Sequence, residues 1–172
     1  MIRRESDGTY FRFSTGTKIQ IATASAISGP WTIKGSAIPA GSIINLPGRD
    51  DLWAPDIAKV GDLYYLYYSV SEFGSQNSAI GLATSPSMDV GTWTDLGSTG
   101  ITSKPGSNYN AIDANLIALN EGGYRLTWGS FWGDIYSVAA KNPPKSITGS
   151  AVNVAFNPSG THAVEGPNLF YR

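Results

Sequence analysis

Three acidic residues recur at nearly even spacing and could carry out proton chemistry together. Asp56, Asp113 and Glu165 stand 57 and then 52 residues apart (56 to 113, 113 to 165), and each precedes a short strand-like stretch. Carboxyls gathered in one cleft raise one another's pKa, and a carboxyl with a raised pKa can donate a proton at neutral pH. Carboxyl pairs of this kind hydrolyse glycosidic bonds. For a single Asp before a strand, a turn or capping role is the simpler interpretation. The regular spacing favours function for Asp113 and Glu165 and leaves Asp56 open.

The elements that must position these acids belong to an internal repeat. An aromatic strand led by glycine stands at residues 8–15, 61–69 and 122–130. A second strand type follows it at residues 18–25, 79–85 and 134–139. Strand-rich units that recur in the same order are typical of β-propeller blades, whereas a β-sandwich does not explain the recurrence. Acids on the innermost strands of successive blades are expected at equivalent positions facing one central channel.

Composition restricts the remaining function classes. The 172 residues carry 12 Lys and Arg against 13 Asp and Glu, a net charge of −1, and this balance offers no electrostatic footprint for nucleic acid or acidic membranes. The absence of cysteine excludes disulfides and thiolate metal sites. No apolar run approaches the ~20 residues that span a bilayer, and residues 1–5 (MIRRE) show no apolar signal region.

Four motifs in order make the chain resemble glycoside hydrolase family 43, and within it the endo-1,5-α-L-arabinanases. They are WAPDI at 53–57, NAID at 110–113, GSFW at 129–132 and EGP at 165–167. The resemblance implies an all-β fold, an incomplete five-bladed β-propeller with about three blades and the first strand of a fourth. The expected single domain, 1–172, divides into blade 1 at about 1–50, blade 2 at 51–108, blade 3 at 109–160 and the start of blade 4 at 161–172. Ala114 departs from the proline usual in the family after this Asp.

The resemblance also implies the roles of individual residues. Glu165 is the expected general acid, and Asp113 is the expected residue that tunes the pKa of its neighbour and orients substrate. The expected substrate-binding residues are Trp53, Asp56, Asn110, Ser130, Phe131, Trp132 and His162. Blade packing is the alternative for Phe131 and Trp132, and a loop position is the alternative for His162, since a lone histidine is rarely a metal site.

An inverting glycosidase also needs a carboxylate base across the sugar, ~6.5–9.5 Å from the acid. The family places this base at the start of the first blade. Counting back from Tyr10 puts it at or before Met1, and Glu5 and Asp7 fall in the following turn. The base is therefore expected to be absent, and the chain is expected to be truncated at both ends.

These observations predict a secreted glycosidase that degrades arabinan. A non-catalytic sugar-binding or assembly fragment stays open as an alternative, as does another family 43 specificity such as β-xylosidase or arabinofuranosidase. The resemblance implies no required cofactor, although a channel ion such as calcium can accompany a complete propeller. The expected partner is arabinan or an arabino-oligosaccharide, with a complementing propeller fragment or self-association through open blade edges as a further expectation.

Overall fold

The computed structural model describes residues 1–161 and 163–172, and its regular elements there are all strands. No helix in this part of the chain is long and apolar enough to cross a membrane. The strands form three separate antiparallel sheets of four. The first contains β1 (Ile2–Arg3), β2 (Tyr10–Ser14), β3 (Gln20–Ala24) and β4 (Thr32–Ser36). The second contains β5 (Trp53–Val60), β6 (Leu63–Val70), β7 (Ser78–Ser85) and β8 (Thr94–Ser103). The third contains β9 (Asn115–Ala118), β10 (Tyr124–Trp128), β11 (Ile135–Ala140) and β12 (Ile147–Ala155).

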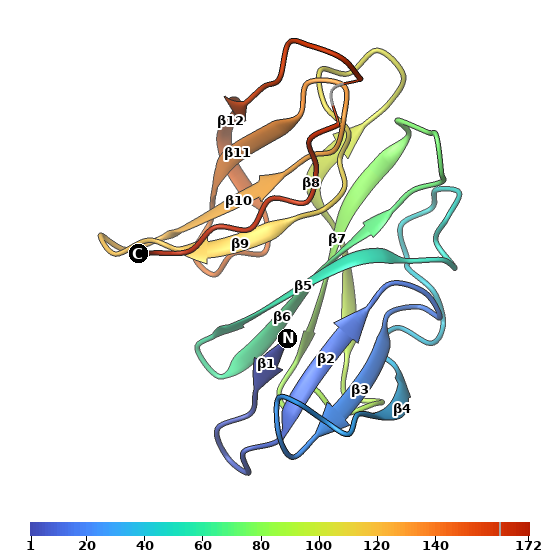
Figure 1. Cartoon of the computed structure of the whole chain (residues 1–172), viewed down its shortest axis with the longest axis vertical. Coiled ribbons are helices and arrows are strands. Elements are labelled where there is room, and N and C mark those ends of the chain that lie inside the picture. The colour runs from blue at the N-terminus through green and yellow to red at the C-terminus, as the bar shows by residue number, and fades with distance from the viewer. Residues whose placement is uncertain (162) are drawn as a thin grey trace.

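Each sheet is one blade of a β-propeller, and the blades follow one another in chain order (Figure 1). Within every blade the strands pair with their neighbours in sequence, so each is a simple meander joined by turns. The three sheets lie within the residue ranges expected for blades 1, 2 and 3. The aromatic repeat strands predicted from the sequence are β2, β6 and β10, the second strand of each blade.

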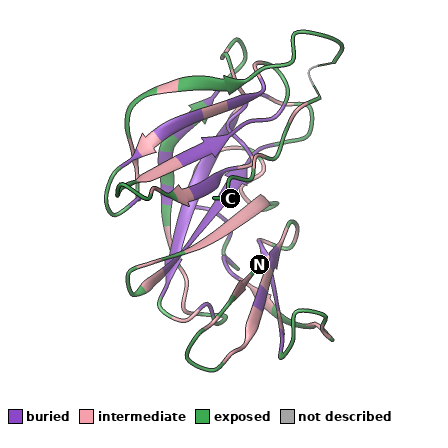
Figure 2. Cartoon of the chain, turned by 60° about the vertical axis from the view of Figure 1, so that its left-hand side comes forward, coloured by how far each residue is buried: buried purple, intermediate pink, exposed green. Residues whose placement is uncertain are grey.

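The middle blade holds the molecule together because both of its faces are covered. Side chains alternate between the two faces of a strand. On β6, Leu66 and Tyr68 join one core with Phe11 and Ile21 of the first blade. The neighbouring tyrosines of β6 face the other core, which is shared with the third blade. This two-sided packing explains why β6 reads as a nearly continuous apolar run, and burial is concentrated in such strands rather than in turns (Figure 2).

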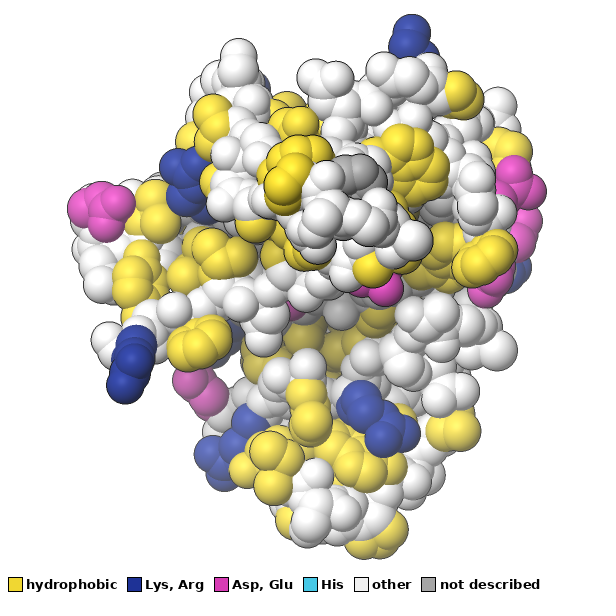
Figure 3. All heavy atoms as spheres, turned by 45° about the horizontal axis from the view of Figure 1, so that its top comes forward, with side chains coloured by type: hydrophobic (Ala, Val, Ile, Leu, Met, Phe, Trp, Pro, Cys, Tyr) yellow, Lys and Arg dark blue, Asp and Glu magenta, His cyan; other side chains and the backbone are white. Residues whose placement is uncertain are grey.

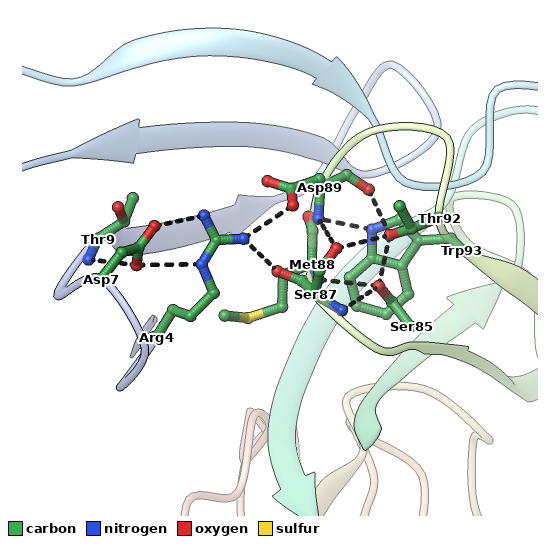
Figure 4. A network of polar contacts seen from close by, with 9 residues as sticks. All are labelled: Arg4, Asp7, Thr9, Ser85, Ser87, Met88, Asp89, Thr92 and Trp93. Atoms are coloured by element: carbon green, nitrogen blue, oxygen red, sulfur yellow. Dashed lines mark hydrogen bonds and ion pairs between the residues drawn. The ribbon is translucent and has the colours of Figure 1, made fainter. Parts of the chain in front are cut away.

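A polar network also fastens the first blade to the second (Figure 4). The Arg4 guanidinium forms ion pairs with Asp7 at 2.7 Å and with Asp89 at 2.8 Å. It also donates to the backbone oxygen of Ser87 at 2.7 Å and lies 4.8 Å from the ring centre of Phe11. Because Asp89 and Ser87 belong to the turn after β7, Arg4 ties the entry of blade 1 to that turn.

The expected first strand of a fourth blade is not formed as a strand. Residues 166–172 have no regular structure, although they run beside β9 (Figure 1). Their contacts with β9 pass through side chains, as in the 2.9 Å bond from the Leu169 amide to Asn115 Oδ1. A strand needs the backbone of a neighbour for its hydrogen bonds, and among the described residues no such ladder forms here. The segment expected to begin blade 4 thus lies beside β9 without strand pairing among the described residues.

Candidate active site

A cavity of about 760 Å³ opens at one end of the inner strands, within the usual size of a small-molecule site. Residues from all three blades and from the segment after β12 form its wall. Of the sequence-predicted site residues, it is lined by Trp53, Asn110, Asp113, Ser130, Phe131, Trp132 and Glu165. The space-filling view shows acidic side chains between hydrophobic ones along a recess across the molecule (Figure 3).

The two expected catalytic carboxyls lie together in this cavity. Ser130 Oγ donates a 2.7 Å hydrogen bond to Glu165 Oε2, and the backbones of the same two residues form an isolated β-bridge. The Asp113 backbone N–H donates to Ser69 Oγ at 3.0 Å, which fixes the loop that carries this carboxyl. Burial raises the pKa of Asp113 to about 6, the nearby negative charge of Glu165 adds to the increase, and a hydrogen bond from the Gly166 N–H opposes it.

Strand register shows why the two carboxyls meet, and it corrects the expected equivalence of the three acids. Ile57 pairs with Leu66, and Leu116 pairs with Leu126, each partner standing two residues after the leading tyrosine of its strand. Counting back from these pairs makes Asp56 equivalent to Asn115, so the predicted match of Asp56 with Asp113 was wrong by two residues.

Asp113 is instead equivalent to Ala54, and the backbone confirms this alignment. Both residues have a left-handed φ, 61° and 45°, and so does Gly166 in the segment after β12, at 62°. The residues just before these three are Trp53, Ile112 and Glu165, and all of them line the cavity. Blades 2 and 3 therefore both send these two adjacent positions into the cavity, and the segment after β12 sends the first of them, Glu165.

Asp56 does not line this cavity. It lies in an adjoining one of about 690 Å³, which Met1, Asp113 and Glu165 also line. Its Oδ2 accepts the backbone N–H of Leu116 at 2.9 Å. Burial raises the pKa of Asp56, against the opposing effect of the Leu116 N–H and the Asn115 side chain.

The aromatic side chains of the GSFW motif face the cavity instead of packing within a blade. Phe131 is 36% exposed and Trp132 is 41% exposed. Both have left-handed φ values, and the Asp134 N–H bonds back to the Phe131 carbonyl at 2.6 Å, which closes a tight turn. Flat aromatic faces held at the rim of a cavity can receive the apolar face of a sugar ring.

Asn110 has a packing role as well as a place in the wall. Its side chain is buried, and its Oδ1 accepts a 2.8 Å bond from Ser78 Oγ. Trp53 is half-buried, and its indole N–H donates to Asp51 at 3.3 Å. His162 lies outside the described residues.

Sequence reasoning missed the loop at residues 72–75, which forms one side of the cavity. Phe73 on this loop is 99% exposed, and its neighbours Glu72, Gly74 and Ser75 also line the wall. The signal that could have revealed this loop is an aromatic residue between a glutamate and a glycine in a turn. Packing in the core does not explain an aromatic residue at such a position.

The structure offers few alternatives for acid–base or metal chemistry near the site. Glu5 forms an ion pair with Lys59 at 2.9 Å, and Asp7 forms one with Arg4, so both expected poor substitutes for the base are held away from the cavity. Among residues 1–161 and 163–172, no three His, Cys, Asp or Glu side chains group so that they could hold a metal ion.

Paired carboxyls in an aromatic-walled cavity at the end of propeller strands are the arrangement expected of a propeller of the glycoside hydrolase class. The model of the glycosyl hydrolases family 43 matches residues 1–172, and the chain belongs to that family.

Named relatives and solved structures support this assignment in detail. The chain is 59% identical to arabinan endo-1,5-alpha-L-arabinosidase A of Aspergillus niger over 99% of this chain and 53% of that protein. It is 55% identical to the protein of the same name from Aspergillus aculeatus, with the same coverage. The native arabinanase of Bacillus subtilis superposes with a TM-score of 0.89 at 34% identity, over 100% of this chain and 60% of that one.

A Cellvibrio cellulosa alpha-L-arabinanase complexed with arabinohexaose superposes with a TM-score of 0.82 at 27% identity, over 97% of this chain and 56% of that one. Arabinanases of this family are five-bladed propellers, which confirms the predicted architecture. The chain spans about half the length of the curated relatives it matches.

Proposed function

We propose that this chain forms the acid-bearing part of the active site of an inverting arabinan hydrolase that cleaves α-1,5-linked arabinose. The observation that carries the proposal is the shared cavity of Asp113 and Glu165, in which Ser130 holds the Glu165 carboxyl. The names of the fungal relatives, arabinan endo-1,5-alpha-L-arabinosidase, support the substrate and favour it over a β-xylosidase or arabinofuranosidase specificity.

The proposed chemistry follows from the two carboxyls. Glu165 protonates the glycosidic oxygen as the bond to the anomeric carbon breaks, so that the leaving sugar departs as an alcohol. Asp113, which keeps its proton up to about pH 6, stands beside it and hydrogen bonds to the bound sugar. Phe131 and Trp132 hold the sugar rings against the rim. This proton transfer uses side chains alone, so a cofactor is not part of the proposal.

Inversion also requires a carboxylate that activates water on the opposite face of the sugar. Glu5 and Asp7 do not supply it, because their ion pairs with Lys59 and Arg4 lie on another part of the surface. The beginning of the first blade does reach the carboxyls, since Met1 lines the cavity that adjoins them. This supports a base contributed from the start of blade 1, as in the family.

A second candidate is a sugar-binding fragment that keeps the cavity and does not hydrolyse arabinan. The ion-paired state of Glu5 and Asp7 favours it, because neither is free to serve as base. Association with a complementing propeller fragment is part of this second candidate. For either candidate we propose an extracellular location, which the fungal relatives support because their named substrate is a polysaccharide.

Incubation of the 172-residue chain with debranched arabinan, alone and with a base-bearing start of blade 1 supplied as a separate segment, separates the two candidates. Hydrolysis that yields arabino-oligosaccharides, and that is abolished in Glu165→Gln while sugar binding persists, supports the first. Binding of arabinohexaose without hydrolysis supports the second. Hydrolysis that is unchanged in Glu165→Gln refutes the assignment of the general acid, and the absence of both binding and hydrolysis refutes the proposed function.

A further inference from the structure

A hydrogen-bonding pattern repeats between the inner strands of successive units. Asp56 Oδ2 accepts the Leu116 N–H at 2.9 Å, from blade 2 to blade 3. Asn115 Oδ1 accepts the Leu169 N–H at 2.9 Å, from blade 3 to the segment after β12. Asp56 and Asn115 are equivalent by strand register, and each accepted amide lies three residues after a left-handed residue, Asp113 or Gly166.

The two acceptors also contact each other. The Asn115 side chain interacts with the Asp56 carboxylate, and its Nδ2 lies 3.5 Å from Asn168 Oδ1 on the other side. Asp56, Asn115 and Asn168 thus form a line of polar side chains along the inner strands. We call these three residues the inner ladder.

We propose that Asp56 is a positioning residue: by accepting the Leu116 amide it fixes the entry of β9 and so places the Asp113 carboxyl beside Glu165. Asn115 does the same for the segment that carries Glu165. This inference rests on the proposed function and revises the sequence-based expectation that Asp56 contacts substrate. It is supported by the absence of Asp56 from the wall of the larger cavity.

The amide that Asp56 accepts lies close along the chain to the Asp113 carboxyl. Only two residues lie between Asp113 and Leu116, and the Asp113 N–H is itself held by Ser69 of β6. The chain that enters β9 is therefore fastened to blade 2 twice, at Asp113 by Ser69 and at Leu116 by Asp56. Removing the Asp56 carboxylate leaves the Leu116 amide without this partner and removes one of the two attachments.

Charge is not required for this role, because the chain itself contains an uncharged version of the same contact. In the next unit an asparagine oxygen, Asn115 Oδ1, accepts the equivalent amide at the same 2.9 Å distance. Asp56→Asn should therefore preserve the contact, whereas Asp56→Ala should abolish it. A residue that acts as base or contacts substrate through its charge would not tolerate either change.

Asp95 provides a matched control, since its carboxylate also joins distant segments through a backbone amide. Its Oδ2 accepts the Ile43 N–H at 2.8 Å, and its Oδ1 accepts the Tyr68 hydroxyl at 2.6 Å. It lies outside both cavities described above. Asp95→Ala consequently reports the cost of losing a half-buried carboxylate contact without any effect on the site.

The experiment compares Asp56→Ala, Asp56→Asn and Asp95→Ala in the 172-residue chain by arabinohexaose affinity and by NMR titration of the Asp113 carboxyl. We expect Asp56→Ala to weaken binding about tenfold and to lower the pKa of Asp113 below that in Asp56→Asn. We expect Asp56→Asn and Asp95→Ala to bind within about threefold of the parent chain.

Equal effects of Asp56→Asn and Asp56→Ala would overturn the proposal, because they would show that charge is what matters. Equal effects of Asp56→Ala and Asp95→Ala would also overturn it, because the loss would be one of general stability. If the parent chain does not bind arabinohexaose, the proposed function fails. The titration of Asp113 then still tests the positioning role by itself.

Discussion

The Ser130 hydroxyl donates a 2.7 Å hydrogen bond to Glu165 Oε2, and the backbones of these two residues pair in a β-bridge. The bridge joins the turn after β10 to the segment after β12, two parts of the chain 35 residues apart. The position of the proposed general acid therefore depends on a residue of the neighbouring blade.

When a base-bearing segment is supplied, replacing Ser130 by alanine should lower turnover of debranched arabinan about tenfold, because the Glu165 carboxyl loses the hydrogen bond that orients it. The affinity for arabinohexaose should change less than turnover. Steady-state kinetics with the parent chain and the variant measure the difference. Ser98→Ala, at an exposed serine of β8, serves as the control. Equal turnover in Ser130→Ala and the parent chain would argue against this role.

Trp132→Ala should weaken arabinohexaose binding about three- to tenfold, because a half-exposed ring at the cavity rim loses its apolar contact with the sugar. Phe73→Ala should act in the same direction. Titration calorimetry gives the affinities. Phe170→Ala is a suitable control, since Phe170 is 78% exposed and does not line the cavity. An unchanged affinity in Trp132→Ala would show that the sugar lies elsewhere.

The contribution of Asp113 to the stability of the chain should fall as the pH rises from about 4 to 7. The pKa of Asp113 is about 6 in the folded chain against an ordinary 3.8, so the folded state binds more protons than the unfolded state within this window. Relative to Asp113→Asn, which mimics the protonated group, the parent chain should lose about 1 to 2 kcal/mol of unfolding free energy, allowing for partial solvent screening. Urea unfolding at several pH values measures this loss. Parallel pH dependence in the two proteins would contradict it.

Arg4→Ala should destabilise the fold by about 1 to 2 kcal/mol, because two ion pairs and a bond to the Ser87 carbonyl are lost between blades 1 and 2. The affinity for arabinohexaose should stay the same, because Arg4 does not line the larger cavity. Urea unfolding and calorimetry test the two statements separately. A stable variant with weakened binding would reverse this interpretation.

The blades could be predicted from the sequence because apolar and polar residues alternate along many of the strands, and because the aromatic strand recurs in each unit. The apolar run of β6 could be recognised in the sequence, since both faces of that strand are buried. The meeting of Asp113 with Glu165 could also be predicted, because a propeller repeat brings successive inner strands around one axis.

The register of the acids could not be predicted. Matching by charge aligned Asp56 with Asp113, whereas the backbone aligns Ala54, Asp113 and Gly166 through their left-handed φ values. These three residues share no side-chain chemistry, so nothing in their types reveals the equivalence. The structure of residues 166–172 could not be predicted either, because strand formation depends on a backbone neighbour and not on local composition.

The coupling of Asp113 and Glu165 is the central claim, and a carboxyl titration tests it most directly. NMR titration of Asp113 in the parent chain should give a pKa of about 6. In Glu165→Gln the pKa of Asp113 should fall, since the neighbouring negative charge is gone, while burial keeps it above 3.8. An Asp113 that titrates near 3.8 in the parent chain, or identically in both proteins, would show that the two carboxyls do not share a site.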